Sequence, residues 1–194
     1  MTLSNLQQNF TVWWGPNFFY PEVTDRWLPV IRRQMYPWLS VSDYMLAQIQ
    51  SFSLPAVNMK NVTQQGGRYQ LTKRSGNTLD EAMDKSLTIT FKLTEGYTSY
   101  FIMRQQLDLY YQIIKTKPLY MSPINIDLLD DSGHAIITYE QEQVTPIGMS
   151  ELQLSYASKL GSYTTFTLEC KYNYFSIWYL DSVSKKMIRE DNLA

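Results

Sequence analysis

Hydrophobic and polar residues alternate along several stretches of the chain, a period of two that is typical of β-strands with one buried face. In the clearest example, residues 87–93, Leu, Ile, Phe and Leu occupy one face and Thr, Thr and Lys the other. The same alternation predicts further strands at residues 45–50, 124–128, 137–140, 151–156 and 165–174. The turn sequence Asp130-Asp131-Ser132-Gly133 predicts that the strands on either side of it form a hairpin.

The period changes between residues 98 and 116, where five apolar residues recur at spacings of three and four: Tyr100, Met103, Leu107, Tyr110 and Ile114. At 1.5 Å per residue a helix there is roughly 27 Å long, enough to cover one face of a small sheet. A shorter helix is predicted at residues 24–35. The sequence therefore predicts a mainly β fold with one flanking α-helix, arranged as a β-sandwich or barrel.

The first 43 residues differ in composition from the rest, with four of the five Trp and half of the eight Pro. We expect three parts: an aromatic and Pro-rich arm at 1–43, a β domain at 44–176 and an extension at 177–194. Large aromatic side chains suit a buried interface. Sequence alone leaves open whether the arm packs on its own domain or on a neighbouring subunit. The candidates for an inter-subunit contact are Trp13, Trp14, Phe18, Phe19, Trp27 and Trp38.

Catalytic chemistry has few candidates, because the chain has one Cys and one His. Cys170 falls on the apolar side of a predicted strand and His134 follows a turn glycine, so a catalytic pair is not expected. Asp127, Asp130 and Asp131 could hold a cation, but turn formation accounts for the last two and the spacing does not fit a calcium loop. We therefore predict no enzyme activity, no metal site and no cofactor.

Charge and hydropathy argue against two further classes: a basic protein that binds a nucleic-acid backbone, and a protein with a membrane-spanning segment. Basic residues number 17 and acidic residues 18, so there is no overall basic excess to hold a nucleic-acid backbone. No apolar run is long enough to span a bilayer, and the first eight residues lack the basic flank and apolar stretch of a secretion signal. We expect no membrane anchor.

Three segments, in this order of elements, resemble the tail tube proteins of contractile-tailed bacteriophages, whose fold is shared with the secreted tube proteins of type VI secretion systems. The first is residues 47–55, AQIQSFSLP, a strand that leaves through a Pro into a long loop. The second is the strand at 87–93 with the helix that follows it. The third is residues 146–156, PIGMSELQLSY, followed by a closing strand at 165–174.

The resemblance covers about residues 44–176, and the segments on either side exceed what a compact tube subunit needs. This departure is compatible with a specialised ring where a tube meets a baseplate or neck. It is equally compatible with a tube whose subunits interlock through arms.

The resemblance implies a β-sandwich-like subunit that assembles into hexameric rings whose inner sheets join into one barrel. Stacked rings form the tail tube, through which DNA is delivered into the host. The polar strand faces would line the lumen, where short hydroxyl and carboxylate side chains let DNA slide without binding. The lumen-facing candidates are Thr88, Thr90, Lys92, Thr138, Glu140, Thr165, Thr167, Glu169 and Lys171.

Residues 56–77 are polar and interrupted by Gly, which predicts a long loop with a short strand at 69–72. This stretch has four basic residues and no acidic one. By resemblance it lies between stacked rings, where we expect it to meet an acidic patch on the next ring. The candidates are Lys60, Arg68, Lys73 and Arg74 on the loop, with Asp127, Asp130, Asp131, Glu140 and Glu142 on the patch.

The predicted partners are other copies of the chain and the sheath, baseplate and neck proteins of a virion, with DNA as a transient, non-specific passenger. The predicted location is the virion tail tube, assembled in the host cytoplasm. Two alternatives stay open: a specialised tube-like ring at the baseplate or neck of the same tail, and a secreted tube protein of a bacterial contractile injection system. A ligand-binding β-barrel is a third, more distant possibility.

Overall fold

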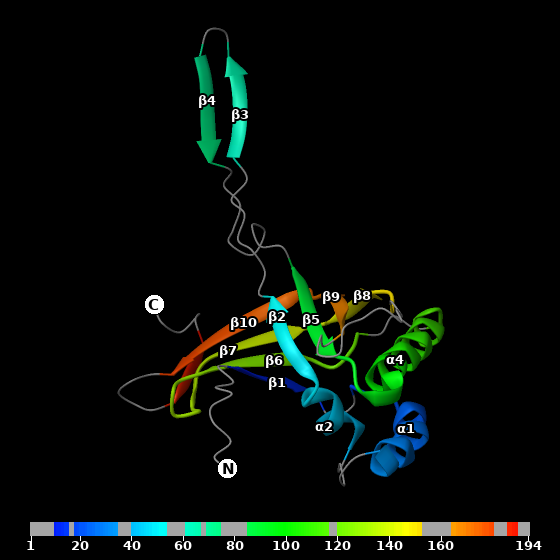
Figure 1. Ribbon diagram of the computed structural model, residues 1–194. Helices are drawn as coiled ribbons and strands as arrows, with labels where there is room; N and C mark the ends of the chain where they lie inside the picture. Colours follow the sequence, from blue (N-terminus) through cyan, green and yellow to red (C-terminus); the bar gives the residue numbers. More distant parts are fainter. Residues whose placement is uncertain are drawn as a thin grey trace.

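A computed structural model gives the fold of the chain (Figure 1). It describes residues 10–15, 18–34, 40–53, 61–66, 69–74, 85–116, 120–152, 164–180 and 186–189. Within the two-stranded segment at 61–74 only the backbone is described.

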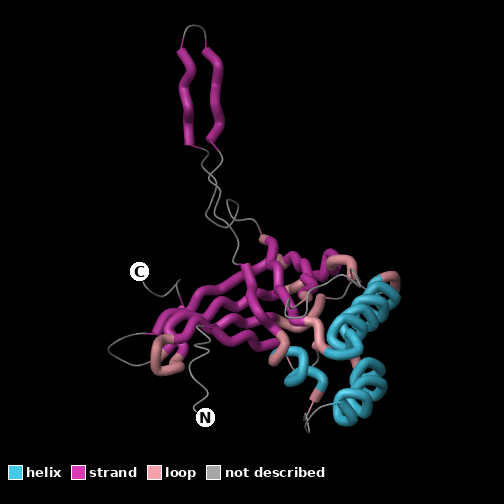
Figure 2. The backbone as a smooth tube through the Cα atoms, viewed as in Figure 1, coloured by secondary structure: helices cyan, strands magenta, loops and turns pink. Residues whose placement is uncertain are grey.

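Two antiparallel sheets form the body of the molecule (Figures 1 and 2). The five-stranded sheet has the order β1-β6-β7-β10-β11, and the four-stranded sheet has the order β2-β5-β9-β8. The strands of the first are β1 Phe10–Trp14, β6 Ile124–Leu129, β7 Ala135–Glu142, β10 Tyr174–Leu180 and β11 Met187–Arg189. The strands of the second are β2 Ile49–Ser53, β5 Ser86–Lys92, β8 Thr145–Met149 and β9 Thr165–Lys171.

The core lies between the two sheets because each strand turns its apolar side chains toward the other sheet. In β5, Leu87, Ile89 and Phe91 are fully buried, and their cross-strand partners on β9 are Cys170, Leu168 and Phe166. The rings of Phe91 and Phe166 stack with centroids 5.2 Å apart. Facing them from the five-stranded sheet are Val12, Trp14, Ile124 and Ile126. The predicted alternation at residues 87–93 is confirmed, and so is the mainly β fold.

Helix α4, Thr98–Ile114, confirms the long helix predicted at residues 98–116. Its stripe of Ile102, Met103, Leu107 and Tyr110 is buried, and Tyr100 packs edge-on against Phe166 of β9. The helix therefore covers the same face of the four-stranded sheet that contributes to the core. It begins after a short 3-10 turn, Glu95–Tyr97.

Two further helices precede β2, so the described part of the chain has three α-helices. Helix α1, Pro21–Gln34, confirms the shorter helix predicted at residues 24–35, packs beside α4 and keeps Pro29 inside it. Helix α2, Val41–Leu46, was not predicted and replaces the first half of the strand predicted at 45–50. Ser40 caps α2 by accepting a hydrogen bond from the Asp43 amide, and burial of Val41, Tyr44 and Met45 follows helical spacing.

The C-terminal half differs from the sequence prediction in two places. The strand predicted at 165–174 is two strands, because the chain leaves the four-stranded sheet after β9 and enters the five-stranded sheet as β10. The strand before them is β8, at 145–149, rather than 151–156, and its pairing with β9 is bulged between Pro146 and Gly148. Residues 153–156 of the predicted strand lie outside the described residues.

Residues 61–74 form a hairpin rather than a loop with one short strand. Strand β3, Asn61–Gly66, pairs with β4, Tyr69–Arg74, in register along their whole length. The hairpin belongs to neither of the two sheets, and Figure 1 draws it projecting from the body of the molecule. The alternation in the sequence is weak here because polar residues stand at both odd and even positions of β3.

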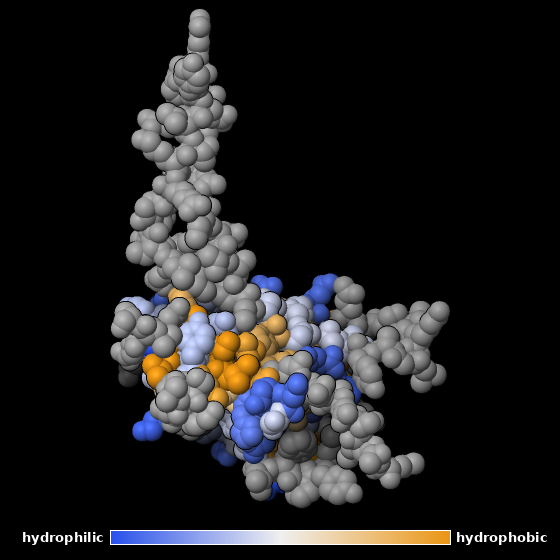
Figure 3. Space-filling view, turned by 90° about the vertical axis from the view of Figure 1, so that its left-hand side faces the viewer, coloured by the Kyte–Doolittle hydropathy of each residue, from blue (hydrophilic) through white to orange (hydrophobic). Residues whose placement is uncertain are grey.

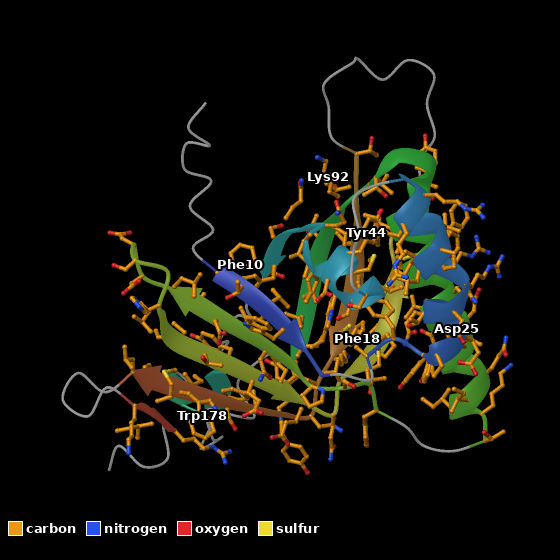
Figure 4. All side chains as sticks on the ribbon, turned by 90° about the horizontal axis from the view of Figure 1, so that it is seen from below. Phe10, Phe18, Asp25, Tyr44, Lys92 and Trp178 are labelled. Carbon is orange, nitrogen blue, oxygen red and sulfur yellow. The ribbon has the colours of Figure 1, made fainter. Side chains whose placement is uncertain are left out.

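Part of the described N-terminal segment belongs to the core of this chain. Strand β1 pairs with β6 over its five residues, and Phe10 at its start packs edge-on against Phe52 of β2 (Figure 4). The predicted arm is thus joined to the predicted domain by a strand pairing, and β10 runs past residue 176. The division into an arm at 1–43, a domain at 44–176 and an extension at 177–194 stays a prediction.

Candidate functional site

Seven of the nine lumen candidates lie together on the outer face of the four-stranded sheet. They are Thr88, Thr90 and Lys92 on β5 and Thr165, Thr167, Glu169 and Lys171 on β9. Cross-strand register sets Thr90 beside Thr167 and Thr88 beside Glu169. The outer face thus presents mainly hydroxyl groups.

Strand β2 extends this hydroxyl face. Ser51 pairs with Thr90 and Ser53 pairs with Thr88, so both serines share the face with the threonines. The formal charges on the seven candidates are two Lys and one Glu, which nearly balance. A face of short hydroxyls with so little net charge gives a polyanion no strong hold. We refer to this surface, formed by Ser51, Ser53 and the seven candidates, as the hydroxyl face.

The remaining two lumen candidates lie elsewhere, which corrects the grouping made from sequence. Thr138 and Glu140 belong to β7 of the five-stranded sheet. Thr138 donates a hydrogen bond to Asp127 Oδ1 at 2.6 Å, and Trp178 Nε1 donates to Glu140 Oε2 at 3.1 Å. Alternation had placed them on a polar strand face, but it could not tell which of two sheets that face belonged to.

The two edges of the four-stranded sheet are β2 and β8. Among the described residues, β2 pairs only with β5, and β8 pairs along its length only with β9. Because every pairing in this sheet is antiparallel and the number of strands is even, the two edge strands run in opposite directions. Unpaired edges of this kind can accept a strand from another chain.

Three of the acidic candidates, Asp127, Asp130 and Asp131, lie at or next to the turn between β6 and β7, whereas Glu140 and Glu142 lie toward the far end of β7. Asp130 Oδ1 accepts hydrogen bonds from the backbone amides of Ser132 and His134, both at 2.8 Å, and these bonds lower the pKa of Asp130. Gly133 supplies the positive φ, 81°, that the turn needs. Asp131 is exposed, and so is Glu142 at the end of β7.

Of the basic candidates, Lys73 and Arg74 belong to β4, while Lys60 and Arg68 lie outside the described residues. A contact between the basic and the acidic candidates stays a prediction about separate copies.

The aromatic candidates of the N-terminal segment divide by burial. Trp14, Phe18 and Phe19 are 9%, 2% and 8% exposed and pack in this chain's own core. Trp14 stacks on Phe18, and its indole Nε1 donates a hydrogen bond to Ser42 Oγ at 2.7 Å. For these three the intramolecular alternative is correct, and we no longer propose an inter-subunit role for them.

Trp13 is 55% exposed, on the outer side of β1. Trp27 is half-buried, and its Nε1 donates to Gln105 Oε1 on α4 at 2.7 Å. Trp38 lies outside the described residues. Among the described candidates, Trp13 is the most exposed, and its contact with another chain stays a proposal.

Two polar contacts of α4 were not predicted from the sequence. Gln106, buried on the apolar stripe of α4, donates to the Phe18 carbonyl at 2.6 Å and accepts from the Tyr20 amide at 3.0 Å. Tyr111 on the exposed side of α4 donates to the Ile147 carbonyl on β8 at 2.9 Å. A single Gln within an apolar helical stripe indicates that its side-chain amide has hydrogen-bond partners inside the protein. The sequence does not show which residues those partners are.

The groups with catalytic potential lie apart. Cys170 is buried on β9, and burial raises the pKa of its thiol to about 12. His134 is exposed at the β6–β7 turn, 3.7 Å from Asp130, in the other sheet. Within the described residues, no three His, Cys, Asp or Glu side chains gather closely enough to hold a metal ion. None of the described helices is long and apolar enough to cross a membrane.

Comparison with known proteins finds a likeness of fold. No family model and no curated protein matches the sequence. A chain of the anti-feeding prophage cap, a tube terminating cap, superposes with a TM-score of 0.52 at 10% identity, over 89% of each chain. A chain of the sheath–tube complex of an extracellular contractile injection system, PVC, superposes with a TM-score of 0.50 at 10% identity. That match covers 92% of this chain and 94% of the other. The expected tail-tube fold is therefore confirmed.

Proposed function

We propose that this chain is a non-enzymatic structural subunit whose copies form rings, and that the rings stack into the tube of a contractile, phage-type tail. The fold shared with chains of a tube cap and of a sheath–tube complex supports this proposal. The surfaces of the chain support it independently, because its open strand edges and its polar sheet face both suit a closed ring.

The observation that carries the proposal is the direction of the edge strands. Rotation about a ring axis keeps the direction of every strand that runs roughly along that axis. Because β2 and β8 run in opposite directions, β8 of one copy lies antiparallel to β2 of the next. The four-stranded sheets can thus close into one antiparallel barrel, which removes both exposed edges. In the five-stranded sheet the edge strands β1 and β11 run in the same direction. The five-stranded sheets of neighbouring copies therefore could not join through antiparallel pairing.

In this ring the hydroxyl face lines the lumen, because the opposite face of the same sheet is the protein core. Six copies give a barrel of about 24 strands, and barrels of 16–18 strands already leave an aqueous channel. Thr88, Thr90 and Thr167 present hydroxyl groups to whatever passes. DNA is the proposed passenger, since a lining with little net charge does not retain phosphates.

The five-stranded sheet and the helices then lie away from the lumen, where the sheath, baseplate or neck proteins of the virion would meet them. The end of the molecule seen in Figure 3 carries apolar surface beside hydrophilic surface. Among the described residues, Ile136 on β7 is 39% exposed. Exposed apolar area of this kind suits contact with other proteins.

Stacking of rings is assigned to the β3–β4 hairpin. Residues 56–77 carry four basic and no acidic residues, and the β6–β7 turn carries Asp130 and Asp131. Opposite charges on two parts of one chain favour contact between different copies. Each exposed pair contributes only about 0–1 kcal/mol, but the contact recurs in every subunit of the ring.

A ring at the end of a tube is the second candidate, favoured by the likeness to a chain of the tube terminating cap. A ring within a tube must make the stacking contact with the ring above it and with the ring below it. A ring at the end of a tube needs this contact on one side. A secreted tube of a bacterial contractile injection system shares the ring and differs only in its passenger.

Sedimentation velocity and negative-stain images of the purified protein test these proposals together. Long tubes identify a main tube subunit, and isolated rings that do not stack at any salt concentration identify a terminal ring. A profile of monomers only, across concentration and salt, contradicts both.

A further inference from the structure

A shallow apolar hollow lies beside the β2 edge of the four-stranded sheet. Its volume is about 330 Å³, and its lining is Phe10, Thr11, Val12, Trp13, Leu46, Ala47 and Ile49. One wall is the edge strand β1, and the other is the end of α2 and the start of β2, which Figures 1 and 4 draw side by side. The described residues that line the hollow, which we call the β1–β2 groove, include no charged side chain.

The opposite edge of the same sheet carries a projecting apolar side chain. Ile147 on β8 is 48% exposed, at the bulge between Pro146 and Gly148, so no residue of β9 lies directly across from it. The Tyr111 hydroxyl binds the Ile147 carbonyl at 2.9 Å and holds this stretch of backbone to α4. Tyr111 is itself 41% exposed. Because its carbonyl is already bonded, Ile147 can meet a neighbour through its side chain rather than through strand pairing.

The groove and Ile147 lie at the two opposite edges of the same sheet. The groove opens between β2 and β1 of the other sheet. At the far edge, the Tyr111 hydroxyl of α4 bonds the Ile147 carbonyl and leaves the side chain exposed. A ring contact is head to tail, so it needs different, complementary surfaces on the two flanks of each subunit. A projecting aliphatic side chain on one flank and an uncharged hollow on the other meet this requirement.

We propose that Ile147 of one copy enters the β1–β2 groove of the next copy around the ring, with Trp13 and Tyr111 forming the exposed rim of this contact. The inference rests on the proposed ring and adds the contact that fixes its subunits in register. Burial of Ile147 in an uncharged groove excludes water from the seam beside the joined strand edges.

Disulfide trapping tests the contact directly in the full chain, with Ala47→Cys and Ile147→Cys introduced together. Ala47 lies on the groove wall and is exposed. Within one chain these positions lie at opposite edges of a four-stranded sheet, roughly 14 Å apart at 4.8 Å per strand. That separation exceeds the roughly 7 Å limit for a disulfide, so only a bond between copies can form. Native Cys170 is buried and does not compete.

Mild oxidation should give the double variant a ladder of covalent oligomers that ends at the ring size, whereas each single variant gives dimers at most. Pairing Ala47→Cys with Ile136→Cys, on exposed β7, is the matched control and should give no ladder. Rings of wild-type protein without a ladder from the double variant overturn this inference and leave the proposed function standing. Monomeric wild-type protein overturns both.

A charge substitution gives a second, independent measurement. Ile147→Glu places a carboxylate in an uncharged groove, so the concentration needed for half-assembly should rise by about tenfold or more. Adding Ala47→Lys should recover most of the loss, and Ile136→Glu should leave assembly unchanged. Equal assembly by Ile147→Glu and wild-type protein contradicts the contact. Circular dichroism checks that each variant is folded.

Discussion

Cys170 illustrates how the four-stranded sheet determines the chemistry of a single side chain. It lies on β9, fully buried, between Leu87 on β5 and Pro146 on β8. Burial raises the pKa of its thiol from 9.0 to about 12, because a thiolate would lose its hydration. The thiol is therefore neutral and inaccessible in the folded chain, in keeping with a structural role.

We expect Cys170 to resist a thiol reagent at pH 8 in the native protein and to react once the chain is unfolded. The raised pKa also makes stability depend on pH. Between pH about 9 and about 12 the thiol loses its proton in the unfolded chain but keeps it in the folded chain, so the contribution of Cys170 to the free energy of unfolding falls as pH rises. Rapid reaction of the folded protein at pH 8 would show that β9 is open to solvent.

Much of the hydroxyl face could be predicted from sequence at the level of residues. Thr88, Thr90 and Thr167 stand at alternate positions in strands whose other face is wholly apolar, and this period is independent of topology. Thr138 fell into the same group by the same rule, but it belongs to the other sheet. Alternation in the sequence shows which residues of a strand share a face. The sheet to which that strand belongs depends on the order in which the strands pair, which alternation does not show.

Strand β1 shows what the N-terminal segment contributes as an element. It forms an edge of the five-stranded sheet and sends its two adjacent tryptophans to opposite faces. Trp14 points into the core, where it stacks on Phe18, and Trp13 is exposed beside the β1–β2 groove. One strand thus supports both the fold and a surface available to another copy.

Trp14→Ala and Trp13→Ala form a matched pair that separates these contributions. Trp14→Ala should lower the free energy of unfolding by about 3–5 kcal/mol, because it leaves a cavity in the core. It also removes the hydrogen bond to Ser42. Trp13→Ala should leave the stability of the monomer nearly unchanged. Chemical denaturation of the two variants makes the comparison, and equal losses would contradict the assigned burial.

Elements were predicted best where one period persisted without interruption. Helix α4 and strand β5 each have a long, regular stripe, and both were found close to their predicted bounds. The division between β9 and β10 was missed because alternation continues through Tyr172 and Asn173 while the chain passes from one sheet to the other. Helix α2 was missed because six residues are too few to distinguish a helical period from alternation.

The whole molecule has its charges distributed in a way that suits stacked copies. The hairpin segment at 56–77 is basic, and the β6–β7 turn is acidic, although the chain as a whole carries a formal charge of -1. Net charge alone gave no hint of an electrostatic contact. The charge asymmetry along the sequence predicted one, but which copies it joins depends on an assembly that sequence does not specify.

Replacing Arg68, Lys73 and Arg74 with Ala should shorten tubes while leaving single rings intact. The substitutions remove three of the four positive charges in the segment at 56–77, and the wild-type contact should likewise weaken as salt screens it. Tube length in negative-stain images, measured across a salt series, provides the readout. Arg26→Ala with Arg32→Ala and Arg33→Ala on α1 also removes three positive charges and is the matched control for a simple change in net charge. Tubes of unchanged length in the triple variant would rule out this contact.

An electron cryomicroscopy reconstruction of the assembled particle would show whether the four-stranded sheet closes around a channel with the hydroxyl face inside. We expect a continuous antiparallel barrel in which β8 of each copy adjoins β2 of the next, with Thr90 and Thr167 facing the channel. A channel lined by the five-stranded sheet, or a hydroxyl face buried between copies, would contradict it.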